Sequence, residues 1–262
     1  MITLKKLYRT LTNKFNLKLQ EEWDQSGIRR FSSWEKHVNK ILLCLDCTNR
    51  TIDEGIKTSC DVIVSHHPIF TGSNEIKEHH NTKQILNRLK KNKISLISLH
   101  TCVDANEYGL NWYLIKMLKL KNISCIKMPN NSIKYYIGFF KQPLAFNNAI
   151  NLINQTFKTN SIKYLRKTKK ISTIVLSCGA GFSVLKPDLN NFDKNALIIT
   201  GDIKWHDWIL LDDLEINGLD VGHDLEKYFI NLINEFLIDK IPRLKIIKHF
   251  PTIKLVSVNN KW

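Results

Sequence analysis

Short apolar runs alternate with amphipathic helical patterns along this chain, and that alternation limits the folds that it can adopt. The runs at 41–45, 62–64 and 94–100 are each followed by a stretch with helical spacing. A strand–helix–strand order of this kind is typical of a parallel sheet with helices on its faces. The second half repeats the pattern, with predicted strands at 171–178 and 196–200. The sequence therefore predicts an α/β protein.

The bulk composition is that of a packed protein without a membrane segment. The 262 residues allow one large domain or two small ones, and 43% hydrophobic content is ample for a core. No apolar stretch approaches the roughly 20 residues that span a bilayer, and the first residues contain no signal core, so we expect a cytoplasmic protein. Six scattered cysteines predict reduced, buried thiols. Cys44 and Cys47 form a C-x-x-C without a second pair, which favours a structural role.

The net charge is +15, and lysine supplies most of it. Arginine, which suits bidentate recognition of phosphates and bases, is scarce. Lysines spread along a chain are more typical of a compositional bias than of a nucleic-acid groove. The composition therefore disfavours specific nucleic-acid binding and predicts a weak attraction to polyanions.

Two adjacent histidines, His66 and His67, follow the predicted strand at 61–64. Ligands of open α/β sheets bind outside the carboxyl ends of the strands. Pro68 favours an extended backbone at His67, and adjacent side chains on extended backbone point in different directions. The two imidazoles could therefore reach two metal ions, or one ion and a neighbouring group. The alternative is that they are two polar residues at the start of a loop.

Three further residues with the chemistry of metal ligands, Asp104, His223 and Glu226, lie at predicted strand ends or helix starts. Glu226 follows His223 by three residues, a spacing that places both on one helix face. Asp104 could instead cap a helix that begins near Ala105, His223 could pack locally, and Glu226 could be a first-turn acid. The pair at His79 and His80 is better interpreted as a solvated helix start. Together, the candidates favour a metal site, and their mixed nitrogen and oxygen donors leave the metal open.

Six dispersed motifs, in order, resemble those of one protein family along essentially the whole chain. That family comprises the GTP cyclohydrolase I type 2 homologues, also called the Ngg-one-interacting-factor-three-like family. Its last ligand pair is often spaced His-x-x-x-Glu, whereas here it is His-x-x-Glu and Lys227 stands at the fourth position. The matching stretches are Trp23-Asp24 with Gly27, Ser65-His66-His67-Pro68, His100-Thr101-Cys102-Val103-Asp104, Gly179-Ala180-Gly181, Thr200-Gly201-Asp202 with His206, and Val221-Gly222-His223 with Glu226.

The resemblance implies two similar α/β lobes with mostly parallel sheets flanked by helices, at 1–125 and 126–262, with the metal site between them. It implies a homohexamer in which each subunit holds two divalent ions, such as Zn, Mn or Fe. The ligands that it implies are His66, His67, Asp104, His223 and Glu226.

The resemblance also places His100 and His206 near the site, where each would support a ligand or move a proton. Asp202 could orient His206. A metal-bridging hydroxide would hydrolyse a nucleotide or a related small molecule, and the lysines weakly favour a phosphorylated substrate. A non-catalytic protein that binds metal and regulates a partner remains the alternative. Gly179-Ala180-Gly181 is too short for a phosphate-binding loop.

Overall fold

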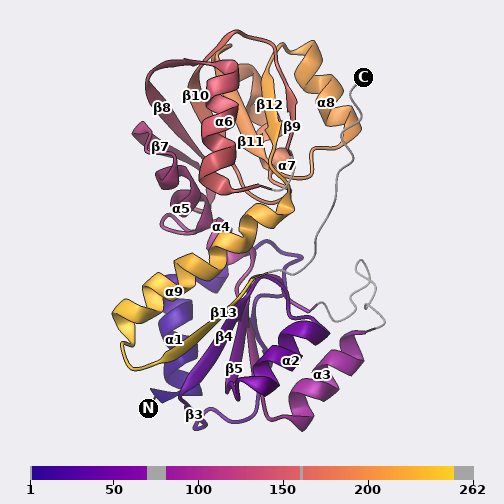
Figure 1. Ribbon diagram of the computed structural model, residues 1–262, viewed down its shortest axis with the longest axis vertical. Coiled ribbons are helices and arrows are strands. Elements are labelled where there is room, and N and C mark those ends of the chain that lie inside the picture. Colours follow the sequence, from indigo (N-terminus) through magenta and orange to yellow (C-terminus); the bar gives the residue numbers. More distant parts are fainter. Residues whose placement is uncertain (1, 70–80, 160–161, 251–262) are drawn as a thin grey trace. The chain divides into compact units, whose positions relative to one another are not determined.

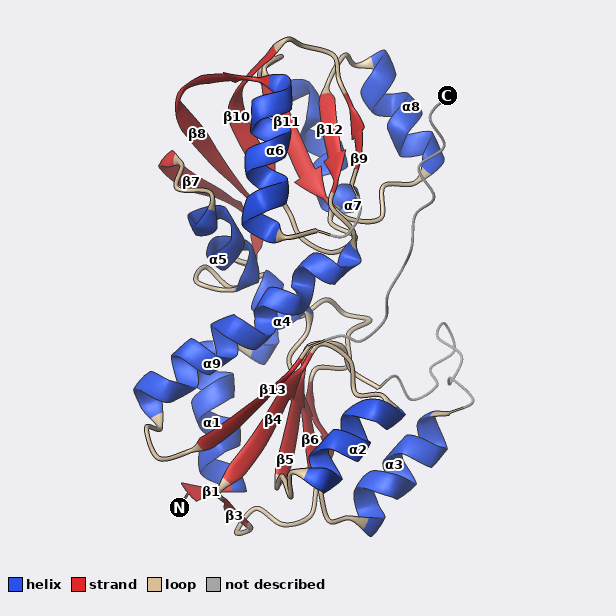
Figure 2. Cartoon of the chain, in the orientation of Figure 1, coloured by secondary structure: helices blue, strands red, loops and turns tan. Residues whose placement is uncertain are grey.

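The computed structural model describes residues 2–69, 81–159 and 162–250, which form two compact units (Figures 1 and 2). Unit 1 comprises residues up to 106 together with 227–250, and unit 2 comprises 107–226. Each unit has its own sheet and its own helices, which confirms the two predicted α/β lobes. The limits differ from the predicted 125/126 boundary, because the chain enters unit 2 earlier and later returns to unit 1.

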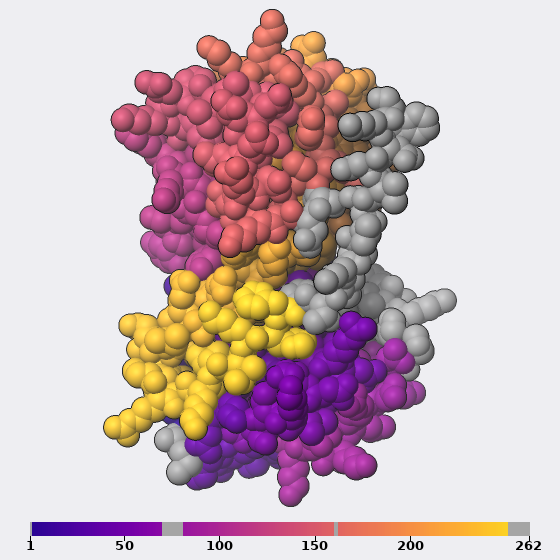
Figure 3. All heavy atoms as spheres, viewed as in Figure 1, coloured from indigo at the N-terminus to yellow at the C-terminus, as the bar shows by residue number. Residues whose placement is uncertain are grey.

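The sheet of unit 1 has five strands in the order β13-β4-β5-β6-β2. The first four are parallel, and β2 runs antiparallel to β6. The sequence predicts a loop over 22–28, whereas β2 already begins at Gly27. Figure 3 shows residues of the returning segment, in yellow, against the indigo and purple residues of unit 1. The strands are β2 (Gly27–Arg30), β4 (Lys40–Cys44), β5 (Val62–Ser65), β6 (Ser95–Ser98) and β13 (Lys245–His249).

Helices cover both faces of this sheet, with α1 and α9 on one side and α2 and α3 on the other (Figure 1). In α1, Leu4, Leu7 and Leu11 recur at helical spacing and are all buried. The helix begins after Thr3, whose side chain accepts a hydrogen bond from the amide of Lys6 at 3.2 Å. The helices are α1 (Leu4–Lys14), α2 (Asn49–Lys57), α3 (Thr82–Lys91), the short α4 (Thr101–Asp104) and α9 (Phe229–Lys240), with a 3-10 turn η1 (Leu17–Leu19) and a small ribbon of β1 (Ile2–Thr3) and β3 (His37–Val38).

The sheet of unit 2 has six strands in the order β7-β8-β10-β11-β12-β9. Only the central three are parallel, whereas β7, β8 and β9 pair antiparallel with their neighbours. The sheet is therefore mixed rather than mostly parallel, because the β-rich stretch near 123–140 adds two antiparallel strands. The strands are β7 (Lys121–Lys127), β8 (Ile133–Ala145), β9 (Lys163–Leu165), β10 (Lys170–Leu176), β11 (Ala196–Thr200) and β12 (Asn217–Asp220).

In unit 2, α6 packs on one face of the sheet, and α7 and α8 lie behind the other (Figure 2). The second face carries a core cluster in which Val175 and Ile198 of the sheet meet Leu185 and Leu211 of the helices. The helices are α5 (Leu110–Met117), α6 (Phe146–Phe157), α7 (Phe182–Leu185) and α8 (Trp205–Asp213), with the 3-10 turns η2 (Lys186–Asn191) and η3 (His223–Tyr228).

The described residues include no helix that is long and apolar enough to cross a membrane. All six cysteines are free, and only Cys125 is partly exposed. Burial raises the pKa of the Cys47 thiol to about 12, which fits an inert thiol of the C-x-x-C pair. The sequence also predicts closing strands over 244–258, of which the part at 251–258 lies outside the described residues, as does the second histidine pair, His79 and His80.

Candidate functional site

The carboxyl ends of two neighbouring parallel strands gather four of the predicted site residues in unit 1. β5 ends at Ser65, directly before His66 and His67, and β6 ends two residues before His100. Asp104 is the last residue of α4, which follows β6. One ring nitrogen of each of the three histidines lies within 4.8 Å of those of the other two. Strand order and register therefore place these groups at one edge of the sheet.

The nitrogen and oxygen atoms of this group have spacings that suit metal ligands. His66 is fully buried, and its Nε2 lies 3.6 Å from Oδ2 of Asp104. An ion with bonds of about 2.1 Å to each of two ligands in tetrahedral geometry holds those ligands about 3.4 Å apart. The pair in the structure has nearly that separation. The rings of His66 and His67 lie 5.0 Å apart, and that of His100 is 5.1 Å from His66.

Each of the three histidines has its Nδ1 beside an oxygen acceptor. An acceptor at Nδ1 keeps the ring proton there, so that the lone pair is on Nε2, the atom that would bind a metal. Ligating histidines commonly have this kind of partner. The pairs are His66 with the carbonyl of Leu99 (2.9 Å), His67 with Oδ1 of Asp46 (2.7 Å) and His100 with Oδ1 of Asp24 (3.1 Å).

Asp24 belongs to a stretch whose sequence predicts only a turn, but in the structure it is buried and accepts several hydrogen bonds. Its Oδ2 accepts from the amide of Thr101 at 3.1 Å, the hydroxyl of Thr101 at 2.6 Å and the hydroxyl of Ser26 at 2.8 Å. Burial alone would raise the pKa of Asp24, but the hydrogen bonds from His100, Thr101 and Ser26 outweigh it and lower that pKa to about 2. The neighbouring Trp23 meets the ring of His100 edge-on at 5.5 Å and is 47% exposed.

The remaining two candidate ligands, His223 and Glu226, lie in unit 2 just beyond the end of β12. Nε2 of His223 lies 3.0 Å from Oε2 of the buried Glu226, as the three-residue spacing predicts. Nδ1 of His223 lies 2.5 Å from Oδ2 of Asp202. The hydrogen bond that His223 donates to the carboxylate of Glu226 raises the pKa of His223 to about 9, although partial burial opposes that shift. His223 thus has the same Nδ1 partnership as the three histidines of unit 1.

Gly179 makes room for the carboxylate of Glu226. This glycine has a φ of +59°, and a Cβ atom built on it would collide with Oε1 of Glu226. Gly179 also accepts a hydrogen bond of 2.8 Å from the amide of Gly201, which follows β11. The Gly179-Ala180-Gly181 motif therefore has a packing role at the candidate ligand Glu226. The glycines of this motif could be recognised in the sequence, but the sequence could not show that Glu226 is the residue for which they make room.

The structure alters the sequence interpretation of Asp202 and Asp104, and it shows the surroundings of His206. His206 is 67% exposed on α8, and its imidazole lies 3.5 Å from Oδ1 of Asp207. Asp202, which was expected to orient His206, instead contacts His223 from a left-handed conformation with φ of 53°. Asp104 does not cap the following helix, because it ends α4 and α5 begins only after Gly109.

Comparison with known proteins gives both sequence and structural relatives. The sequence profile of the family described as Duf34/NIF3 (NGG1p interacting factor 3) matches residues 2–252. A protein of Ureaplasma parvum named GTP cyclohydrolase 1 type 2 homolog is 30% identical over 232 residues, covering 87% of this chain and 86% of that protein. A Mycoplasmopsis pulmonis protein of the same name is 26% identical over 240 residues, covering 89% and 92%.

Solved structures show the same fold at lower sequence identity. A hypothetical protein of Staphylococcus aureus superposes with a TM-score of 0.83 at 22% identity, over 96% of each chain. A Bacillus cereus protein related to NIF3 gives 0.81 at 16% identity, over 98% of this chain and 99% of that one. These likenesses establish the fold.

Proposed function

Since this chain belongs to the Duf34/NIF3 family, we propose that it binds two divalent metal ions and hydrolyses a nucleotide or a related small molecule. The names of its curated relatives make GTP the first substrate to test. The mixed set of imidazole and carboxylate donors suits Zn, Mn or Fe, and does not select one of them. The proposed ligands are His66, His67 and Asp104 of unit 1 and His223 and Glu226 of unit 2.

The observation that carries the proposal is that Nδ1 of each of four histidines lies beside an oxygen acceptor, which anchors the ring. Three of the anchors are carboxylates and one is a backbone carbonyl, so every ring can present Nε2 as a ligand atom. Solvated surface histidines have no need of such partners, and their recurrence at strand ends in both units supports a metal-binding role. The anchored residues are His66, His67, His100 and His223.

Bound divalent ions would activate a water for attack and polarise the substrate. The side chains of the chain would position the reactants and move protons. We propose that His100 moves a proton at Nε2, because Asp24 fixes the orientation of its ring beside His66 and His67. His206 is the second candidate for this role, and its exposure leaves it accessible to a substrate.

The first test is the metal content of the full chain, purified without an affinity-tag metal and measured by elemental mass spectrometry. We expect about two ions per chain, as a two-metal site requires. His37, an exposed residue on β3, gives the matched control variant His37→Ala, which should keep both ions. Well-folded protein that stays free of metal after reconstitution with Zn, Mn or Fe would contradict the proposal.

Turnover is tested next with the metal-loaded protein and a panel of nucleotides that starts with GTP. Hydrolysis should disappear in His67→Ala protein that keeps the wild-type circular dichroism, because a ligand to the reacting centre is lost. Unchanged turnover in that variant would rule out hydrolysis at this site. Metal binding without any turnover by the wild type would instead support the non-catalytic, regulatory alternative.

Gly179→Ala should weaken metal binding by about tenfold, because the added Cβ forces the carboxylate of Glu226 away from its position. The left-handed backbone adds a stability cost of about 1 kcal/mol, which a thermal melt would register separately. Metal affinity measured by competition with a chromophoric chelator gives the comparison. If the effect acts through Glu226, the double variant Gly179→Ala/Glu226→Gln should bind no more weakly than Glu226→Gln alone. Additive losses would show that Gly179 acts otherwise.

The proposal also includes the oligomeric state of the protein and its location in the cell. The family resemblance favours a cytoplasmic homohexamer, and the six free cysteines are consistent with a reducing compartment. Light scattering should then give six times the mass of one chain. A monomer at micromolar concentration would refute the hexamer but would not contradict the proposed metal site.

A further inference from the structure

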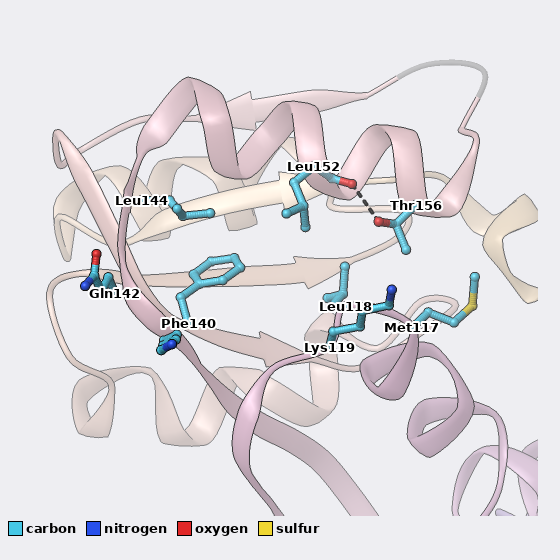
Figure 4. Close-up of a pocket in the computed structure, with 9 residues that line it drawn as sticks. Met117, Leu118, Lys119, Phe140, Gln142, Leu144, Leu152 and Thr156 are labelled. Atoms are coloured by element: carbon cyan, nitrogen blue, oxygen red, sulfur yellow. Dashed lines mark hydrogen bonds between the residues drawn. The ribbon is translucent and has the colours of Figure 1, made fainter.

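Unit 2 contains a hollow that is separate in sequence and in lining from every candidate metal ligand. Its volume is about 640 Å³, within the range of small-molecule sites. It lies beside the end of α5, the outer part of β8 and one side of α6 (Figure 4). The residues that line it are Met117, Leu118, Lys119, Phe140, Lys141, Gln142, Leu144, Leu152 and Thr156.

A large bulge in β8 accounts for this hollow. Phe139 pairs with Thr173 of β10, and Leu144 pairs with Ile171. The four residues 140–143 therefore stand opposite a single residue of β10. The surplus residues of β8 cannot pair with β10 and must bulge out of the sheet. Pro143 lies in this segment and has no amide to donate. The strand arches away from β10 and leaves space that α6 and the end of α5 do not fill.

The interior of the hollow is apolar. Leu118 is buried at its floor, and the ring of Phe140 points inward, with Leu144 and Leu152 on the side of α6 (Figure 4). The hydroxyl of Thr156 donates to the carbonyl of Leu152 at 2.7 Å within the helix. An occupant of this interior would thus gain mainly from burial of its own apolar surface.

The rim of the hollow is cationic. Lys119 and Lys141 are both exposed, and no acidic residue of the described chain pairs with either. The wider surroundings explain this, because residues 108–187 contain thirteen Lys and Arg residues and no Asp or Glu. Among the described residues, four lysines of this stretch form ion pairs with acids outside it, namely Lys127 with Glu107, Lys134 with Asp188, Lys167 with Asp212 and Lys186 with Asp207.

We propose that this hollow binds an amphipathic anion, namely an aliphatic chain that ends in a single carboxylate. The chain would lie against Phe140, Leu144 and Leu152, and the carboxylate would lie at the rim with Lys119 and Lys141. Aliphatic walls with one aromatic ring suit a hydrocarbon chain, and the acid-free surroundings favour an anion over a neutral lipid. The proposal is independent of the metal site and of its activity.

The test is calorimetric titration of the full chain with decanoate and, separately, with decanol, both below their aggregation limits. Decanoate should bind at least tenfold more tightly than decanol, because a charge-assisted hydrogen bond at the rim raises the binding affinity by about tenfold. Lys119→Gln/Lys141→Gln should weaken decanoate binding by about tenfold or more and leave decanol binding unchanged. Leu152→Trp, which fills the interior, should weaken the binding of both.

The matched control is Lys163→Gln/Lys170→Gln, which removes two exposed lysines of the same acid-free stretch that do not line the hollow. This control should bind decanoate like the wild type. Equal weakening by the two lysine pairs would assign the attraction to the general surface charge and overturn the proposal. Equal affinity for decanoate and decanol, or no saturable binding of decanoate, would overturn it as well. The lysine variants carry surface substitutions only, so a failure to fold should not obscure the result.

Discussion

Asp24→Ala is expected to lower the free energy of unfolding of unit 1 by about 3 kcal/mol, because it leaves several buried donors without their acceptor. The carboxylate joins the loop before β2 to the residues after β6 through Ser26, His100 and Thr101. Loss of that acceptor should also release the ring of His100. One substitution would therefore affect both the stability of unit 1 and the orientation of a candidate proton-transfer group.

Chemical denaturation followed by circular dichroism measures the stability change, and hydrogen exchange should show faster exchange in residues 98–104. The matched control is Asp53→Ala, since Asp53 is an exposed acid of unit 1 that pairs with Arg88. Exposed ion pairs contribute about 0–1 kcal/mol, so the control should unfold almost like the wild type. Similar losses in the two variants would show that the buried network at Asp24 contributes little.

The same carboxylate predicts a pH dependence. Its pKa is lowered from 3.8 to about 2 in the folded state, so the folded form binds its proton less readily than the unfolded form. The resulting stability is fully present above pH 3.8 and is lost as the pH falls through 2, an effect of about 2 kcal/mol. In metal-free protein, the wild type should therefore lose more stability than Asp24→Asn between pH 4 and 2. Parallel losses would contradict this assignment.

Phe229→Ala is expected to destabilise unit 1 by about 4 kcal/mol, the usual cost of removing a buried aromatic ring. Phe229 is fully buried at the start of α9, and its ring lies 5.0 Å from that of His66. The ring therefore fixes one side of the most deeply buried candidate ligand. A cavity there would allow the imidazole of His66 to move.

The change is measured by denaturant unfolding, with Ile238→Ala as the control on the same helix. Ile238 is 54% exposed, so its truncation should cost less than about 0.5 kcal/mol. Phe229→Leu keeps most of the buried volume and should fall between the two. A cost below about 1 kcal/mol for Phe229→Ala would show that α9 is not firmly packed against the sheet.

The sequence was informative wherever a short apolar run ended in a polar cluster. The runs before His66 and His100 are strands, and His66 follows the end of its strand as predicted. The second strand was predicted to end in His100, whereas β6 ends at Ser98, two residues earlier. The prediction of these strands succeeds because a buried parallel strand needs apolar residues on both faces, and its end is marked where polar residues begin. Likewise, the three-residue spacing of His223 and Glu226 was enough to predict that their side chains meet.

Long-range partnerships were beyond the sequence patterns. The sequence around Asp24 is typical of a turn, and only the fold brings Thr101 to its carboxylate. Asp202 was assigned to His206 by helical spacing, but its left-handed backbone directs it to His223. The short strand β2 lacks the alternation that marks a strand, since its pairing with β6 decides its conformation. In each case, tertiary contacts outweighed the local signal.

Unit 1 is made of two pieces of chain, and this affects its synthesis on the ribosome. β4 is translated early, but the strand that covers its outer edge, β13, follows only after the whole of unit 2. At about 5–20 residues per second, that edge stays unpaired for roughly ten seconds or more. Unit 2 is a continuous run and can fold during this interval. The nascent chain thus exposes an apolar strand edge that the finished protein covers, so the half-made chain is more prone to aggregate.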